Sequence, residues 1–84
     1  MINFFYFNYT KRRKVLIFKT DIKTKKKVKS LKPYFNNHSE IIKWTIDLED
    51  IDNVLRIEAT KNLNETAVIN QIKTYGFYCN VLED

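Results

Sequence analysis

Apolar and polar residues alternate along four short segments of this chain, and a period of two residues is typical of half-buried β-strands. These segments cover residues 15–20, 42–48, 54–59 and 77–81. Most of their residues are β-branched or aromatic, and charged or turn-forming residues bound them. In and directly after these segments, the alternation places the following side chains on one, mostly apolar, face: Leu16, Phe18, Thr20, Ile22, Ile42, Trp44, Ile46, Leu48, Leu55, Ile57, Ala59, Phe77, Cys79 and Val81. We therefore predict a sheet with one buried face.

A helical period occupies the stretch between the first two strand segments. Val28, Leu31 and Phe35 recur at spacings that place them on one face of a helix. Thr24 precedes this stripe, and a threonine hydroxyl can accept a hydrogen bond from a free amide of the first turn. We predict a helix that begins after Thr24 and ends before a loop at residues 36–39.

A second helix is predicted between the last two strand segments. Asn64 is a suitable N-cap, and Leu63 and Val68 have the spacing of a hydrophobic staple around it. Gly76 has the position and the conformational freedom of the residue that follows a helix C-cap. The apolar stripe of this helix consists of Val68, Ile69, Ile72 and Tyr75.

The predicted order of elements is therefore βαββαβ. The short acidic connection at residues 49–53 favours an antiparallel hairpin between the second and third strands. Right-handed crossovers then give a strand order of 4-1-3-2. This arrangement is the ferredoxin-like sandwich of the α+β class, a four-stranded antiparallel sheet with two helices on one face.

Length and composition limit the class of protein. A chain of 84 residues makes one domain, which we place at residues 15–84, after a poorly ordered extension at residues 1–14. The single cysteine, Cys79, excludes an internal disulfide and suits a reducing compartment, so we expect a cytoplasmic protein. No apolar run approaches the roughly 20 residues that a membrane-spanning helix needs. Residues 2–9 are mostly aromatic, but the charges follow them, whereas basic residues come first in a secretory signal.

Charge is distributed unevenly. Residues 1–43 carry twelve Lys or Arg and two acids, whereas residues 44–84 carry three Lys or Arg and eight acids. The segment KTDIKTKKKVK at residues 19–29 contains six lysines. Such asymmetry indicates an anionic partner. Codon bias is an alternative explanation, because five residue types with AT-rich codons, lysine among them, make up 42 of the 84 residues.

Residues 15–82 resemble the heavy-metal-associated domain of copper chaperones and metal-pumping ATPases. The resemblance rests on the spacing of strand, loop and helix, on WTID at residues 44–47, and on YGF at residues 75–77. It implies the same sandwich and a metal loop of pattern Met-x-Cys-x-x-Cys after the first strand. In such a loop two thiolates bind a soft ion such as Cu(I).

This chain departs from that pattern at the metal ligands. The family's methionine falls on Ile22, its first cysteine on Thr24 and its second on Lys27. A threonine hydroxyl is a poor ligand for a soft ion, and a lysine ammonium repels a cation. We therefore expect a degenerate member without the metal site and without a cofactor.

The remaining candidate residues indicate no catalysis. Cys79 alternates with Phe77 and Val81 on the side of its strand that we expect to be buried, so we predict an inert thiol. His38 is a lone histidine in a loop. No nucleophile–base pair or carboxylate pair is evident, so we expect no enzymatic activity. The acids Asp47, Glu49, Asp50 and Asp52 lack the glycine turn and the closing glutamate of a calcium loop, and we predict a charged hairpin turn.

We expect a protein-interaction module that contacts an acidic protein surface through its lysine-rich loop, without a membrane partner. The contact residues would be Lys23, Lys25, Lys26, Lys27 and Lys29. One alternative is a metal carrier with unconventional ligands, for instance Cys79 with His38 of a second chain. Another is weak, non-specific nucleic-acid binding. Base-specific RNA binding is disfavoured, because the open-face positions Val15, Ile17, Lys19, Val54, Arg56 and Glu58 provide no aromatic stacking platform.

Overall fold

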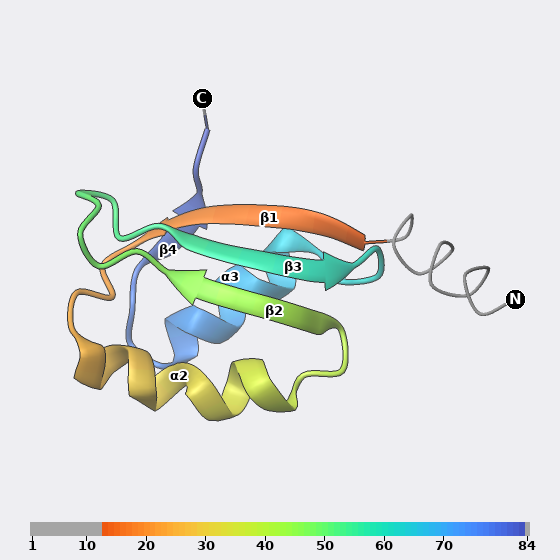
Figure 1. The fold of residues 1–84 in the computed structure, drawn as a ribbon, viewed down its shortest axis with the longest axis horizontal. Coiled ribbons are helices and arrows are strands. Elements are labelled where there is room, and N and C mark those ends of the chain that lie inside the picture. The colour runs from red at the N-terminus through yellow and green to blue at the C-terminus, as the bar shows by residue number, and fades with distance from the viewer. Residues whose placement is uncertain (1–12, 84) are drawn as a thin grey trace, which may run out of the picture.

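The computed structural model describes residues 13–83, and its elements follow the order strand, helix, strand, strand, helix, strand (Figure 1). They are β1 (Arg13–Thr20), α2 (Lys25–Asn37), β2 (Ile41–Ile46), β3 (Leu55–Thr60), α3 (Glu65–Thr74) and β4 (Cys79–Val81). The α+β class and the βαββαβ order predicted from the apolar pattern are therefore confirmed.

The four strands form one antiparallel sheet in the order β2-β3-β1-β4, which is the predicted order read from the other edge. The strand β1 begins two residues earlier than predicted, because Arg13 pairs with Thr60 and Lys14 pairs with Ala59. The last two residues of the expected N-terminal extension thus belong to the sheet. Residues 1–12, for which we predicted poor order, lie outside the described residues.

Both helices cover the same face of the sheet, and one apolar core lies between the layers (Figure 1). Its fully or nearly fully buried side chains are Leu16, Phe18, Ile22, Leu31, Phe35, Leu55, Ile57, Ala59, Leu63, Val68, Ile72 and Cys79. Burial alternates along β1 and β3, because successive side chains of a strand point to opposite faces. Within residues 13–83, no helix covers the other face, which we call the open face (Figure 1).

The edge strand β2 differs from the prediction in its register. Its pairing with β3 shifts between Ile41 and Lys43, so Ile41 packs against the core in place of the predicted Ile42. Beyond this shift the predicted parity holds, and Trp44 is half-buried against α2. The rings of Trp44 and Phe35 lie 4.5 Å apart, and the indole N–H of Trp44 donates a hydrogen bond of 2.9 Å to Asn36 Oδ1. This bond satisfies the polar end of a largely apolar side chain.

The predicted helix caps are confirmed. Thr24 Oγ1 accepts a hydrogen bond of 3.1 Å from the backbone N–H of Lys27. Asn64 Oδ1 accepts one of 2.8 Å from the backbone N–H of Ala67. Each such cap stabilises its helix by about 1 kcal/mol. The helix α2 continues to Asn37, and it thus includes the first two residues of the loop that we predicted at residues 36–39.

The C-terminus of α3 has the predicted glycine in a left-handed conformation. Gly76 has a φ of 91°, its N–H donates to the carbonyl of Lys73, and the N–H of Phe77 donates to the carbonyl of Ile72. These two bonds form a Schellman motif, which satisfies carbonyls that would otherwise lack a donor. Tyr75 does not belong to the buried stripe, because 39% of its surface is exposed.

The β2–β3 connection is an ordered acidic loop. Asp47 Oδ1 accepts a hydrogen bond of 3.0 Å from the N–H of Glu49, and Asp50 Oδ1 accepts one of 2.8 Å from the N–H of Asp52. Asn53 then adopts a left-handed conformation with a φ of 41°, which asparagine tolerates better than most residues. The predicted charged hairpin turn is confirmed, and its backbone conformation is fixed by its own carboxylates.

Candidate functional site

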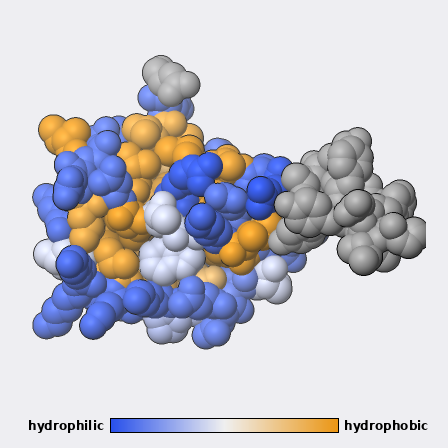
Figure 2. Space-filling model, in the orientation of Figure 1, coloured by the Kyte–Doolittle hydropathy of each residue, from blue (hydrophilic) through white to orange (hydrophobic). Residues whose placement is uncertain are grey.

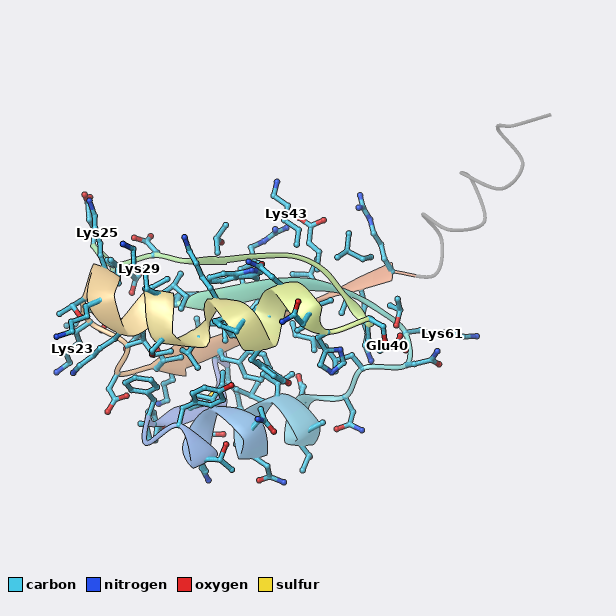
Figure 3. All side chains as sticks on the ribbon, turned by 90° about the horizontal axis from the view of Figure 1, so that it is seen from below. Lys23, Lys25, Lys29, Glu40, Lys43 and Lys61 are labelled. Atoms are coloured by element: carbon cyan, nitrogen blue, oxygen red, sulfur yellow. The ribbon has the colours of Figure 1, made fainter. Side chains whose placement is uncertain are left out.

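The six lysines at positions 23, 25, 26, 27, 29 and 32 lie together at the start of α2 and in the loop before it. All six are exposed. Figure 3 shows Lys23, Lys25 and Lys29 at one end of the domain, with Lys61 and Glu40 at the other end. We call these six side chains the lysine edge. The structure thus brings together all five contact residues predicted from the sequence.

No ion pair joins the lysine edge to an acid among residues 13–83. The first turn of α2 contains no acidic residue. Among residues 13–83 the ion pairs are Arg13–Glu58 at 3.3 Å and Arg56–Glu58 at 2.8 Å, and neither involves the lysine edge. Lysines in the first turn of a helix are also unfavourable beside the positive end of its dipole. Local stability therefore does not explain these lysines, and their ammonium groups are free to contact an anionic partner.

Thr24 and Lys27 are the residues that the predicted resemblance aligns with the two metal-binding cysteines. The hydroxyl of Thr24 caps α2, and the side chain of Lys27 is exposed to solvent. Ile22, which the same resemblance aligns with the family's methionine, is completely buried in the core. The geometry of the loop is that of a capped helix start, and its side chains provide cationic donors where a soft metal needs thiolates.

A shallow groove lies beside the lysine edge, between α2 and the end of β2. It has a volume of about 210 Å³, and its lining residues are Lys25, Val28, Lys29, Lys32, Ile46 and Leu48. Three aliphatic side chains form its floor and three lysines form its rim. Figure 2 shows apolar surface over this part of the molecule. Cofactor pockets usually measure roughly 300–1,000 Å³, so this groove suits a single side chain better.

The groove is not predicted by the pattern of the sequence. That pattern assigns Val28, Ile46 and Leu48 to the core, whereas all three are only half-buried in the structure. The available signal was the spacing of Lys25, Val28, Lys29 and Lys32, which places them on one helical face. Whether that face meets the end of a strand depends on helix–sheet packing, which periodicity does not determine.

Cys79 and His38 do not form a site in this chain. The prediction of a buried Cys79 is confirmed, and burial raises the pKa of its thiol to about 11, against a smaller opposite effect of Lys73. The thiol is therefore neutral at pH 7 and is not the thiolate that binds metals. His38 lies at the C-cap of α2, where its Nδ1 accepts a hydrogen bond of 3.0 Å from the N–H of Glu40. Across residues 13–83, no three His, Cys, Asp or Glu side chains are placed to hold a metal ion.

The open face of the sheet carries a compact ionic cluster. Arg13 and Arg56 both contact the carboxylate of Glu58. A hydrogen bond from Arg56, supported by the charges of Arg13, Arg56 and Lys43, holds the pKa of Glu58 below its usual value despite partial burial. A phosphate approaching Arg56 would compete with this carboxylate. The geometry thus offers less to a nucleic acid on this face than at the lysine edge.

Comparison with known proteins adds no relative. No family model matches the chain, and neither the curated proteins nor the solved structures give a significant match. Within residues 13–83, no helix is long and apolar enough to cross a lipid bilayer. The resemblance to heavy-metal-associated domains therefore stays a prediction from the residues.

Proposed function

We propose that this chain is a non-enzymatic protein-interaction domain that binds an acidic protein surface through the lysine edge. The observation that carries the proposal is the exposure of six neighbouring lysines with no acidic partner among the described residues. We further propose that the fold is a ferredoxin-like sandwich related to heavy-metal-associated domains, with the metal ligands replaced by Thr24 and Lys27. The single, buried thiol suits a cytoplasmic location.

Electrostatic complementarity supports this role. A cluster of like charges on one side of a small domain steers an oppositely charged partner toward it and accelerates association. Exposed ammonium groups lose little hydration before contact, so the interaction would be fast, weak and sensitive to salt. A carrier of soft metal ions is a poorer fit, because the one thiol is buried and has a raised pKa.

A pull-down with matched variants tests the proposal. Replacing Lys25, Lys26 and Lys27 with serine should lower the recovery of the partner at least tenfold. The control replaces Lys43, Lys61 and Lys73 with serine; these lysines are also exposed but lie outside the lysine edge, and the control should recover the partner as the wild type does. The cap of α2 survives in the first variant, because the backbone N–H of residue 27 is the donor.

Two results would contradict the proposal. Equal recovery with both triple variants would remove the lysine edge from the interaction. A partner that disappears after nuclease treatment, and whose binding falls steeply between two salt concentrations, would indicate a nucleic acid instead.

A further inference from the structure

The acidic loop between β2 and β3 exposes a large apolar side chain at its tip. Ile51 is 94% exposed, far more than any other large apolar side chain among the described residues. It lies between Asp50 and Asp52 and close to Glu49. A single exposed apolar side chain is common on protein surfaces, so Ile51 indicates a contact only if a complementary surface exists, and the groove beside α2 is such a surface.

The groove between α2 and β2 has the complementary properties. Its floor of Val28, Ile46 and Leu48 is apolar, and its rim of Lys25, Lys29 and Lys32 is cationic. Its volume of about 210 Å³ accepts one aliphatic side chain, since a cavity of roughly 150 Å³ holds a benzene molecule. The loop therefore matches the groove in size, in polarity and in charge.

The loop does not occupy the groove of its own chain. Leu48 lines the groove, and the acids of the loop follow it directly in sequence. Nevertheless, no ion pair joins the loop to the lysine edge within residues 13–83. The hydrogen bonds from the N–H groups of Glu49 and Asp52 to the carboxylates of Asp47 and Asp50 hold the loop in its protruding conformation.

We propose that two copies of this chain associate through a reciprocal contact, in which Ile51 of each copy enters the groove of the other. Because the loop and the groove are neighbours on the surface, a two-fold axis beside them brings both contacts together. Such a contact closes after two copies. Each lysine rim then faces the acids of the opposite loop. The inference rests on the proposed function, since it uses part of the lysine edge. In it, one acidic partner of the lysine edge is a second copy of this chain.

The contact is small, and we expect a weak dimer of the kind that buries less than about 1,200 Å². The loop is already ordered by its own hydrogen bonds, so little conformational entropy is lost when it docks. Sedimentation equilibrium should show the average mass of the wild-type chain rising from one copy toward two, and no further, as concentration increases.

Two substitutions test the two halves of the contact. Ile51→Ser removes the anchor, and Lys29→Glu reverses a charge of the rim. Each should weaken self-association at least tenfold. The matched controls are Val15→Ser, an exposed apolar residue on the open face, and Lys61→Glu at the far end of the domain, and both should leave it unchanged. All four positions are exposed, so the variants should fold.

A charge exchange tests the reciprocity. Lys29→Glu and Glu49→Lys each place like charges in both contacts of their own dimers, and the exposed Glu49 side chain is not one of the two carboxylates that order the loop. A mixture of the two variants pairs each altered loop or groove with a complementary one, and it should regain association close to the wild-type strength.

The outcomes separate this inference from the proposed function. A wild-type chain that stays monomeric up to about 1 mM, assembly beyond two copies, or unchanged association of Ile51→Ser would overturn the reciprocal dimer. Loss of an unrelated acidic partner in the triple serine variant would still support the proposed function. The opposite pattern would support only the dimer. In that case Ile51→Ser weakens self-association, but replacing Lys25, Lys26 and Lys27 with serine does not change the recovery of any other partner.

Discussion

Phe18→Ala is expected to lower the free energy of unfolding by about 3–5 kcal/mol, the range found when a buried phenylalanine is truncated. Phe18 lies in the central strand β1, pairs with Leu55 on one side and Val81 on the other, and is completely buried between the sheet and the helices. A small domain has a total stability of only about 5–15 kcal/mol. The variant should therefore unfold at a much lower urea concentration than the wild type.

A control in the same strand separates packing from strand propensity. Val15 lies on the open face and is 46% exposed. Val15→Ala should cost less than about 1 kcal/mol, since strand propensities differ by no more than that. Similar losses in the two variants would mean that Phe18 is not a central residue of the core.

Thr20→Val is expected to lower the free energy of unfolding by about 2–4 kcal/mol, because it leaves two buried backbone groups without partners. Thr20 Oγ1 donates a hydrogen bond of 2.7 Å to the carbonyl oxygen of Asn53 and accepts one of 3.1 Å from the N–H of Ile22. It thereby connects the end of β1 to the β2–β3 loop and to the segment before α2. Valine has nearly the same shape, so the hydroxyl is the difference that urea unfolding would measure.

Thr20→Ser is the matched control, because it keeps the hydroxyl and removes one methyl group. Its cost should stay near 0.8 kcal/mol, roughly the value of one buried carbon. If Thr20→Ser lowered the free energy of unfolding more than Thr20→Val, the methyl group and not the two hydrogen bonds of Thr20 would stabilise this junction.

Local signals predicted most of the fold. The caps Thr24 and Asn64 and the glycine at position 76 mark helix ends through short-range hydrogen bonds and backbone conformation, which depend on few residues. The alternation in β1 and β3 predicted the buried face, since both strands lie in the middle of the sheet and their parity is unbroken. These features required no knowledge of long-range contacts.

Features that depend on packing between elements were missed. The register shift beside Ile42 arises where the edge strand meets its neighbour, and alternation alone assigns this residue to the core. Tyr75 continues the apolar stripe of α3 in sequence, but it lies at the C-cap of the helix, and its side chain is exposed to solvent. The bond between Thr20 and Asn53 joins residues 33 positions apart, and no local pattern indicates it.

The same distinction between local signals and packing applies to the candidate site. The lysines were predicted as a cluster because they are neighbours in sequence, and a helix start keeps such neighbours close in space. The groove beside them was not predicted, because it forms where α2 meets the end of β2. Ile51 belongs to neither pattern, and its significance depends on a measured exposure that the sequence does not contain.

Mapping an acidic probe onto the domain would show whether the lysine edge is the contact surface. A hexaglutamate peptide would be titrated into isotope-labelled protein while the backbone amide resonances are recorded. We expect that the lysine edge binds the probe, with shifts confined to residues 23–32 and the adjoining end of β2, and that these shifts decrease markedly at about 0.15 M salt. Shifts centred on the open face or around Lys61, or no shifts at low ionic strength, would contradict it.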